Sequence, residues 1–322
     1  KHQECYQKAY IVAHVSKIIY FGRKFTKNIC KFHKKELFLR HLFTFLTIYI
    51  NIVRITRENN MKKYGLLGHP LGHSFSRKFH NERFERLGID AEYLNFDLDD
   101  IMQLPEVLQG EGLLCGLNVT IPYKQQVMQF LDELDPVAER IGAVNTVCVK
   151  RQEGKASKLP GLWLKGYNTD IIGFRDSITP LLREAGILPV ADTGAKALLL
   201  GTGGASKAVK VALEDMGIEP IYVSRSKAPG RMTYEDLTPE VMQQCRVIVN
   251  CSPVGMFPHV DECPDIPYEC LSAKHVCYDL IYNPEVTQFL AKAKEKGALT
   301  MSGGAMLEGQ AIASYNYWTS ED

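Results

Sequence analysis

The sequence predicts two α/β domains, and three observations support this prediction. At 322 residues the chain is long enough for two ordinary domains, and its composition, 45% hydrophobic and 23% charged, is typical of a globular protein. Short apolar runs alternate with helical patterns from Met61 to about residue 165, which favours a sheet covered by helices. A second series of this kind starts at residue 197 and opens with a glycine-rich turn.

The first domain is expected to alternate strands and helices along the chain. Residues 150–160 are rich in Lys, Gly and Ser and are predicted to form a hairpin loop, and Gly88 is predicted to end the first helix. The alternation favours a mostly parallel sheet. The predicted strands are 64–68, 91–97, 116–121, 144–149 and 162–167, and the predicted helices are 77–87, 101–108, 123–130 and 135–141.

The second domain begins with the most informative segment of the chain. An apolar strand at 197–200 leads into a glycine-rich turn at 201–206, a helix at 206–216 and a strand at 220–224. In a parallel βαβ unit such a turn lies at the carboxyl end of a strand, where bare backbone and the positive end of a helix bind a pyrophosphate. The alternative is a tight turn with no ligand. Because the strand, helix and second strand are all present, we predict a Rossmann-type dinucleotide-binding domain.

The end of the second strand indicates which dinucleotide is bound. Sites for NAD usually carry Asp or Glu there, whereas a 2′-phosphate is bound by Arg. This chain has Ser224, Arg225, Ser226 and Lys227 and no carboxylate. Arg225 offers a planar fork and Lys227 a second positive charge, while the serines offer hydroxyl donors. We therefore predict NADP as the cofactor. The alternative for Arg225 is a solvated surface arginine.

The first 60 residues differ from the rest of the chain. They carry 12 Lys and Arg against 3 Glu, which leaves 26 basic and 34 acidic residues for the remainder. The apolar run at 42–53 is interrupted by polar residues and is shorter than the ~20 residues of a membrane-spanning helix. The first methionine is Met61. We therefore expect residues 1–60 to be a non-native or disordered leader rather than a membrane anchor or a nucleic-acid arm.

The cysteines and histidines show no metal-binding pattern. The nine cysteines include no Cys-x-x-Cys pair and no Cys/His cluster at zinc spacing, so neither a disulfide framework nor a structural metal is expected. His69, His73 and His80 have no metal-like partner set and are predicted to be structural. A reducing cytoplasm is the predicted compartment, and neither a membrane nor a nucleic acid is an expected partner.

Polar loops follow several of the predicted strands, where open α/β sheets place their ligands. They read GHSFS at 72–76, NVTIPYK at 118–124, GAVNT at 142–146 and GYNTD at 166–170. Later segments read NCSPVGM at 250–256, YDLIYNP at 278–284 and MLEGQA at 306–311. The order, spacing and residues of these motifs resemble the shikimate dehydrogenase family over about residues 61–319.

This resemblance implies reversible, NADPH-dependent reduction of 3-dehydroshikimate to shikimate in the chorismate pathway of aromatic amino-acid biosynthesis. It implies a small-molecule substrate and a monomer or homodimer. The implied substrate-binding domain spans 61–165, completed by a C-terminal helix at 302–322, and the NADP-binding Rossmann domain spans 170–300. Lys124 and Asp170 match the catalytic pair. Matching substrate-binding positions are Ser74, Ser76, Thr120, Asn145, Tyr282 and Gln310. Matching cofactor positions are Gly201, Thr202, Gly203, Gly204, Ala205, Ser224, Arg225, Ser226, Lys227, Leu280 and Gly303.

The chemistry of the residues supports the catalytic pair independently. Hydride transfer to a carbonyl builds negative charge on oxygen, so the site needs a cation that can also deliver a proton, as Lys124 can. Asp170 can hold that lysine and a substrate hydroxyl. The structural alternatives are a solvated lysine at a helix start and an aspartate capping a helix at 171–185. Similarly, the two serines could be loop hydroxyls, and Asn145 and Gln310 could satisfy buried backbone groups.

Three departures from the family pattern leave the cofactor preference and the substrate pocket open. Tyr167 and Ile171 replace a common Asp and Gly, residues 224–226 replace Asn-Arg-Thr, and Cys251 and Pro253 alter Asn-Ala-Thr-Ser. One alternative is a quinate/shikimate dehydrogenase of dual specificity, although the basic segment 225–227 disfavours an NAD-preferring quinate enzyme. The other is a non-catalytic metabolite sensor, which would have no need of a proton-donating lysine.

Overall fold

A computed structural model describes residues 46–47, 61–72, 75–152, 154, 156–189 and 194–320. Residues 61–322 form one compact unit. The predicted leader lies outside the described residues except at Leu46 and Thr47, and so do Ser74 and His73. Within the described ranges, no helix is both long enough and apolar enough to cross a membrane.

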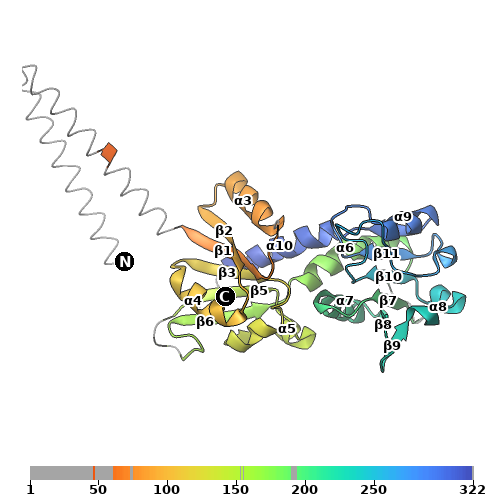
Figure 1. Ribbon diagram of the computed structural model, residues 1–322, viewed down its shortest axis with the longest axis horizontal. Helices are drawn as coiled ribbons and strands as arrows, with labels where there is room; N and C mark the ends of the chain where they lie inside the picture. Colours follow the sequence, from red (N-terminus) through yellow and green to blue (C-terminus); the bar gives the residue numbers. More distant parts are fainter. Residues whose placement is uncertain are drawn as a thin grey trace, which may run out of the picture. The chain divides into compact units, whose positions relative to one another are not determined.

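The first of two six-stranded sheets has the strand order β2-β1-β3-β5-β6-β4 (Figure 1). β1 pairs in parallel with β2 and β3, whereas β5 is antiparallel to both β3 and β6. The sheet is therefore mixed, because β5 and β6 form the predicted hairpin. The strands are β1 (Lys62–Gly68), β2 (Ala91–Asp97), β3 (Leu114–Val119), β4 (Glu133–Leu134), β5 (Thr146–Arg151) and β6 (Leu162–Tyr167).

Helices cover both faces of this sheet. On one face, Phe84 and Trp318 pack with Tyr64 and Tyr93 of the sheet, and these side chains come from α3 (Phe75–Leu87) and α10 (Gly304–Thr319). The other face packs against η1 (Ile101–Gln103), α4 (Leu104–Gly110), η2 (Gln126–Phe130) and α5 (Pro136–Ile141). The first domain therefore has one apolar core on each side of its sheet.

The prediction of a helix at 123–130 is wrong for the first half of that segment. Residues 121–125 form turns, and only Gln126–Phe130 is helical, as the 3₁₀ helix η2. The carbonyl oxygen of Lys124, which an α-helix would use internally, instead accepts the N–H of Val144 at 2.7 Å. This long-range contact ties the lysine backbone to the segment just before β5. The helix predicted at 101–108 likewise begins as the 3₁₀ helix η1.

The second sheet is entirely parallel, with the order β12-β11-β10-β7-β8-β9. Along β7, Ala197 and Leu199 face one core while Leu198 and Leu200 face the other. This confirms the predicted Rossmann-type sheet. The strands are β7 (Lys196–Leu200), β8 (Glu219–Ser224), β9 (Arg231–Thr233), β10 (Val247–Asn250), β11 (Val276–Asp279) and β12 (Leu299–Met301).

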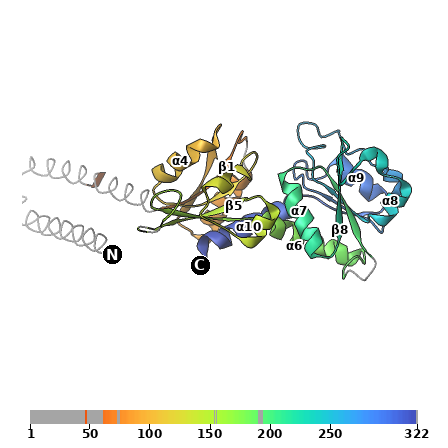
Figure 2. The ribbon, with the colours of Figure 1, turned by 90° about the horizontal axis from the view of Figure 1, so that it is seen from below.

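Helices also cover both faces of the second sheet (Figure 2). α6 (Asp170–Glu184) and α7 (Gly204–Asp215) pack on one face, and α8 (Pro239–Gln244) and α9 (Gln288–Glu295) pack on the other. The short helices η3 (Tyr234–Asp236) and η4 (Tyr268–Cys270) lie in connections. The chain reverses direction across the sheet between β7 and β10, which creates a switch point at their carboxyl ends, where such folds bind ligands.

α6 and α10 run between the two sheets and cross closely (Figure 1). A Cβ atom on Gly309 would lie 3.2 Å from the Cα of Gly173, and one on Gly173 would collide with the carbonyl oxygen of Met306. Glycine is required here because the helix backbones approach without room for side chains. The crossing places α10 beside the first turns of α6.

Candidate active site

A cavity of about 320 Å³ combines the carboxyl end of β3, the start of α6 and one face of α10. Its size falls in the range of small-molecule sites. Of the predicted catalytic and substrate-binding residues, it brings together Ser76, Thr120, Lys124, Asn145, Asp170, Tyr282 and Gln310. It also contains three of the predicted cofactor residues, namely Ala205, Leu280 and Gly303.

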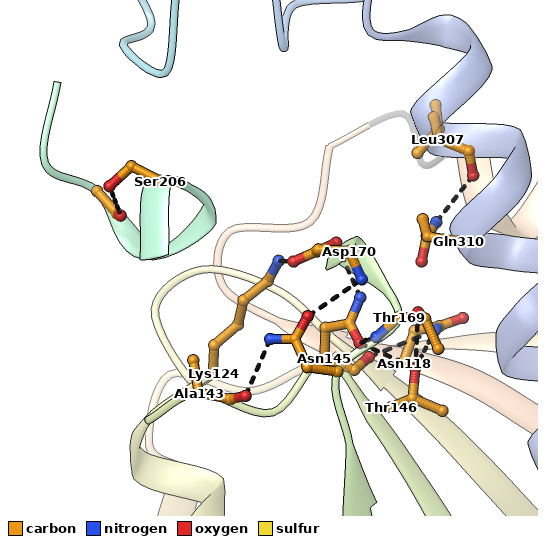
Figure 3. A network of polar contacts seen from close by, with 12 residues as sticks. Asn118, Lys124, Ala143, Asn145, Thr146, Thr169, Asp170, Ser206, Leu307 and Gln310 are labelled. Atoms are coloured by element: carbon orange, nitrogen blue, oxygen red, sulfur yellow. Dashed lines mark hydrogen bonds and ion pairs between the residues drawn. The ribbon is translucent and has the colours of Figure 1, made fainter. Parts of the chain in front are cut away.

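An ion pair between a partly buried lysine and a buried aspartate lies in this cavity (Figure 3). The Nζ atom of Lys124 donates to Oδ2 of Asp170 at 2.6 Å, and the two side chains are 16% and 9% exposed. Asp170 is the first residue of α6, where the helix dipole favours a negative charge. Thr169 occupies the N-cap position. The structure therefore contradicts the two alternatives considered above, because Lys124 is not solvated and the helix is capped by Thr169 rather than by Asp170.

Asn145 holds the carboxylate of this pair from the other side. Its Oδ1 accepts the backbone N–H of Thr169 at 2.7 Å, which fixes the amide orientation, and its Nδ2 donates to Oδ1 of Asp170 at 2.8 Å. Asn145 thus satisfies a buried backbone group and also contacts the carboxylate. Because both oxygens of Asp170 accept charged or amide donors, the orientation of this carboxylate is set before any ligand binds.

The remaining cavity residues are less constrained. Gln310 donates from Nε2 to the Leu307 carbonyl oxygen at 3.0 Å within its own helix, which is the backbone role considered for it above. Tyr282 is 46% exposed and its ring centroid lies 5.9 Å from that of Phe75. Gln310 is thus buried and bonded within its helix, whereas Tyr282 is partly open to solvent.

Asn118 also lines the cavity and was missed by the sequence analysis. It is buried at the end of β3, where its Oδ1 accepts the hydroxyl of Tyr93 at 2.8 Å. The signal available in the sequence was a polar residue inside the otherwise apolar strand pattern of 116–121. An amide at such a position needs partners, and those partners come from distant segments.

A second cavity, of about 450 Å³, lies at the switch point between β7 and β10. It contains the predicted cofactor residues Gly201, Thr202, Gly203, Ser224, Arg225 and Ser226. Gly204 and Lys227 line neither cavity. Arg231 and Tyr234 line it but were missed, because nothing in the sequence shows that β9 pairs beside β8.

This second cavity fits a dinucleotide with a 2′-phosphate. Gly201 has φ = 111°, and a Cβ atom on it would lie 3.1 Å from the backbone nitrogen of Ser252, so only glycine is tolerated. Gly203 caps α7 without a side-chain hydrogen bond, and the first turn of α7 carries no acidic residue. The backbone N–H groups at the start of α7 are therefore not capped by a side chain, and such groups suit a pyrophosphate. Arg225 and Arg231 add two positive charges to the same cavity.

His69 and His80 lie outside both cavities, and so do Tyr167 and Ile171, whereas the departures at 224–226, Cys251 and Pro253 line the second cavity. Nδ1 of His69 lies 2.8 Å from Oδ1 of Asp97, and the ring of Tyr167 stacks on that of Tyr317 with centroids 4.1 Å apart. His80 is buried against Tyr93. Among the described residues, no group of three or more His, Cys, Asp or Glu is placed to hold a metal ion.

A dinucleotide-type cavity beside a buried lysine–carboxylate pair defines an oxidoreductase of the nicotinamide-dependent class. Residues 66–147 match the shikimate dehydrogenase substrate binding domain. The chain is 37% identical over 275 residues to the shikimate dehydrogenase (NADP(+)) of Desulforamulus reducens, covering 79% of this chain and 89% of that protein. It therefore belongs to the shikimate dehydrogenase family, as the sequence motifs predicted.

Solved structures agree with this assignment. Shikimate 5-dehydrogenase from Thermus thermophilus, in complex with NADP(H) and shikimate, has a TM-score of 0.65 at 31% identity, with 80% of this chain and 94% of that chain covered. Quinate dehydrogenase from Corynebacterium glutamicum, in complex with NAD, has a TM-score of 0.67 at 26% identity, with 80% and 94% covered. The fold is thus shared by enzymes named for two substrates.

Proposed function

We propose that the chain catalyses the reversible, NADPH-dependent reduction of 3-dehydroshikimate to shikimate. The observation that carries this proposal is the 2.6 Å contact between Lys124 and Asp170 in a cavity that also contains Leu280 and Gly303 of the dinucleotide-binding side. When bound there, the nicotinamide supplies or accepts the hydride. The chain's own residues must then bind the ring, orient it and move one proton.

Lys124 is proposed to move that proton. In the direction of reduction, its ammonium group donates to the carbonyl oxygen as negative charge develops there, and in the direction of oxidation its amine accepts the hydroxyl proton. Asp170 holds Nζ of the lysine through Oδ2, and its remaining acceptor positions are proposed to bind a neighbouring ring hydroxyl. Asn145 keeps the carboxylate in this orientation.

The other substrate contacts are proposed from their position in the cavity. Ser76 and Ser74 are assigned to the substrate carboxylate, and Thr120, Tyr282 and Gln310 to the ring hydroxyls or carboxylate. All but Ser74 line the cavity that holds the ion pair. Hydroxyl and amide donors suit a polyhydroxylated acid, because they orient it with neutral hydrogen bonds.

NADP is proposed to bind with its 2′-phosphate at Ser224, Arg225, Ser226 and Lys227 and its pyrophosphate at 201–205. The cavity with Arg225 at the switch point supports this. We propose the domain division of 61–165 with 302–322 for substrate and 170–300 for NADP. We also propose a cytoplasmic protein with no nucleic-acid partner, on the basis of composition and cysteine spacing, and a monomer or homodimer, as the family resemblance implies.

The test is a substrate and cofactor matrix on the purified full chain. Reduction of the nicotinamide is followed with shikimate or quinate, each against NADP⁺ and NAD⁺. We expect turnover with shikimate and NADP⁺, with a higher kcat/KM than any other combination. Preference for quinate with NAD⁺ would assign the chain to the alternative enzyme. Binding of both ligands without turnover would instead favour a metabolite sensor.

A further inference from the structure

Three hydroxyl groups from distant segments meet next to the candidate active site. They belong to Thr146 at the start of β5, Thr169 just before α6, and Ser314 in α10. The oxygen of Ser314 lies 2.8 Å from that of Thr146 and 3.0 Å from that of Thr169, and the two threonine oxygens are 3.2 Å apart. All three residues are fully buried. We call Thr146, Thr169 and Ser314 the hydroxyl cluster.

The hydroxyl cluster orients two amides that line the cavity. The hydroxyl of Thr169 donates to Oδ1 of Asn145 at 3.2 Å, and the hydroxyl of Thr146 lies within hydrogen-bond distance of both that oxygen, at 3.0 Å, and the oxygen of Ser314, at 2.8 Å. Ser314 accepts from Nδ2 of Asn118 at 2.8 Å. Because the Oδ1 of Asn145 is surrounded by donors, its amino group must face Asp170. Figure 3 shows Asn118, Thr146 and Thr169 gathered beside Asn145 and Asp170.

Ser314 is the only member of the hydroxyl cluster that comes from the C-terminal helix. Its hydroxyl also donates to the carbonyl oxygen of Gln310 at 2.8 Å, one turn earlier in α10. Because its single proton goes to Gln310, Ser314 serves its other neighbours as an acceptor, and removing its hydroxyl would leave the amino group of Asn118 and the hydroxyl of Thr146 short of that acceptor in a fully buried site. Groups left in this way reorient to find other partners, and a network transmits the change.

We propose that Ser314 is a positioning residue for the reaction. Acting through Thr146, it fixes the amide of Asn145 and hence the carboxylate that holds Lys124. Ser314 lines neither cavity, so it reaches substrate and dinucleotide only through these neighbours. This inference rests on the proposed function.

The first test is Ser314→Ala in the full chain, with steady-state oxidation of shikimate by NADP⁺. We expect kcat to fall about 10-fold while KM for NADP⁺ stays within about twofold, since the second cavity has no contact with the hydroxyl cluster. Ser177→Ala is the matched control, because its hydroxyl also donates to a carbonyl one turn earlier, that of Gly173 at 2.7 Å, and lies outside both cavities. This control should keep the kcat of the parent chain.

A double-mutant cycle separates positioning from general structural support. If Ser314 acts through Asn145, Ser314→Ala should change kcat less than about twofold in the Asn145→Ala background. An equal loss in both backgrounds, or no loss in the parent background, would overturn the inference. Should Ser314→Ala fail to fold, Ser314→Cys keeps nearly the same volume with a weaker hydrogen-bonding group, and the same cycle decides the question.

The activity of the parent chain separates a failure of the proposed function from a failure of the role of Ser314. A parent that does not oxidise shikimate removes the proposed function, and this inference with it. An active parent whose kcat is unaffected by Ser314→Ala removes the role of Ser314 and leaves the proposed function standing.

Discussion

The two cavities of this chain are built in opposite ways. In the first, Asp170 and Asn145 are buried, and their hydrogen-bond partners come from segments far apart in the sequence. In the second, Arg225 and Ser226 are exposed, and Gly201 and Gly203 lie in a short local turn. We call the first cavity, with its buried and hydrogen-bonded side chains, the rigid region, and the second cavity, with its exposed side chains, the open region. Proton transfer, which depends on orientation, is assigned to the rigid region, and binding that depends on charge is assigned to the open region.

Asp170→Asn tests the rigid region with the largest expected effect of these changes. An amide presents a donor on one side, so it cannot accept from both Lys124 and Asn145 as the carboxylate does. We expect kcat for shikimate oxidation to fall at least ~10²-fold. Asp176→Asn, on the same helix but in an exposed pair with Arg175, is the control and should leave kcat unchanged. Near-normal turnover of Asp170→Asn would mean that this carboxylate does not orient the lysine.

Arg225→Ala tests the open region. Loss of a charge-assisted contact to a 2′-phosphate should weaken NADP⁺ binding by about 1.5 to 3 kcal/mol, with a much smaller loss for NAD⁺. Calorimetric titration with both cofactors measures the difference. Arg140→Ala, which removes an exposed arginine paired with Asp215, serves as control. Equal losses for the two cofactors would mean that Arg225 does not bind the 2′-phosphate, and no loss for either would mean that it is a solvated surface residue.

His80→Phe tests the buried layer next to the first cavity, where His80 packs on Tyr93 and the hydroxyl of Tyr93 donates to Asn118. His80 is fully buried, its ring stacks 4.4 Å from that of Tyr93, and neither ring nitrogen has a hydrogen-bond partner. Burial, assisted by the charge of Arg83, lowers its pKa to about 3. As the pH falls below about 6.5, His80 is protonated in the unfolded chain but stays neutral in the folded chain. The free energy of unfolding therefore falls by roughly 1 kcal/mol per pH unit from about pH 6.5 toward pH 3.

Phenylalanine keeps the ring and removes this titration. Relative to the parent chain, His80→Phe should gain about 2 kcal/mol of unfolding free energy on going from pH 7.5 to pH 5, as measured by urea unfolding at both values. His259→Phe, which changes an exposed histidine and keeps His80, is the control and should follow the parent chain at both pH values. An identical pH dependence for His80→Phe and the parent would mean that His80 is accessible to protons in the folded state.

The same contrast explains what the sequence could predict. The open region follows from local pattern, since an apolar strand, a glycine turn and the basic segment 225–227 all lie within residues 197–227. The rigid region was reached through family motifs, which identified Lys124 and Asp170 but not their support. Ser314 lies 196 residues from Asn118 and 168 from Thr146, so no local pattern connects them. The helix expected at 123–130 failed for the same reason, because Val144 takes the carbonyl group of Lys124.

Lys124 is proposed to move the proton in a site already oriented for it. The most direct measurement is kcat for shikimate oxidation by Lys124→Ala, together with the Kd of shikimate for the same variant. We predict that kcat falls at least ~10²-fold while Kd changes no more than about threefold, because the lysine acts on charge that develops in the transition state. Turnover close to that of the parent chain would contradict the account and remove Lys124 from the mechanism.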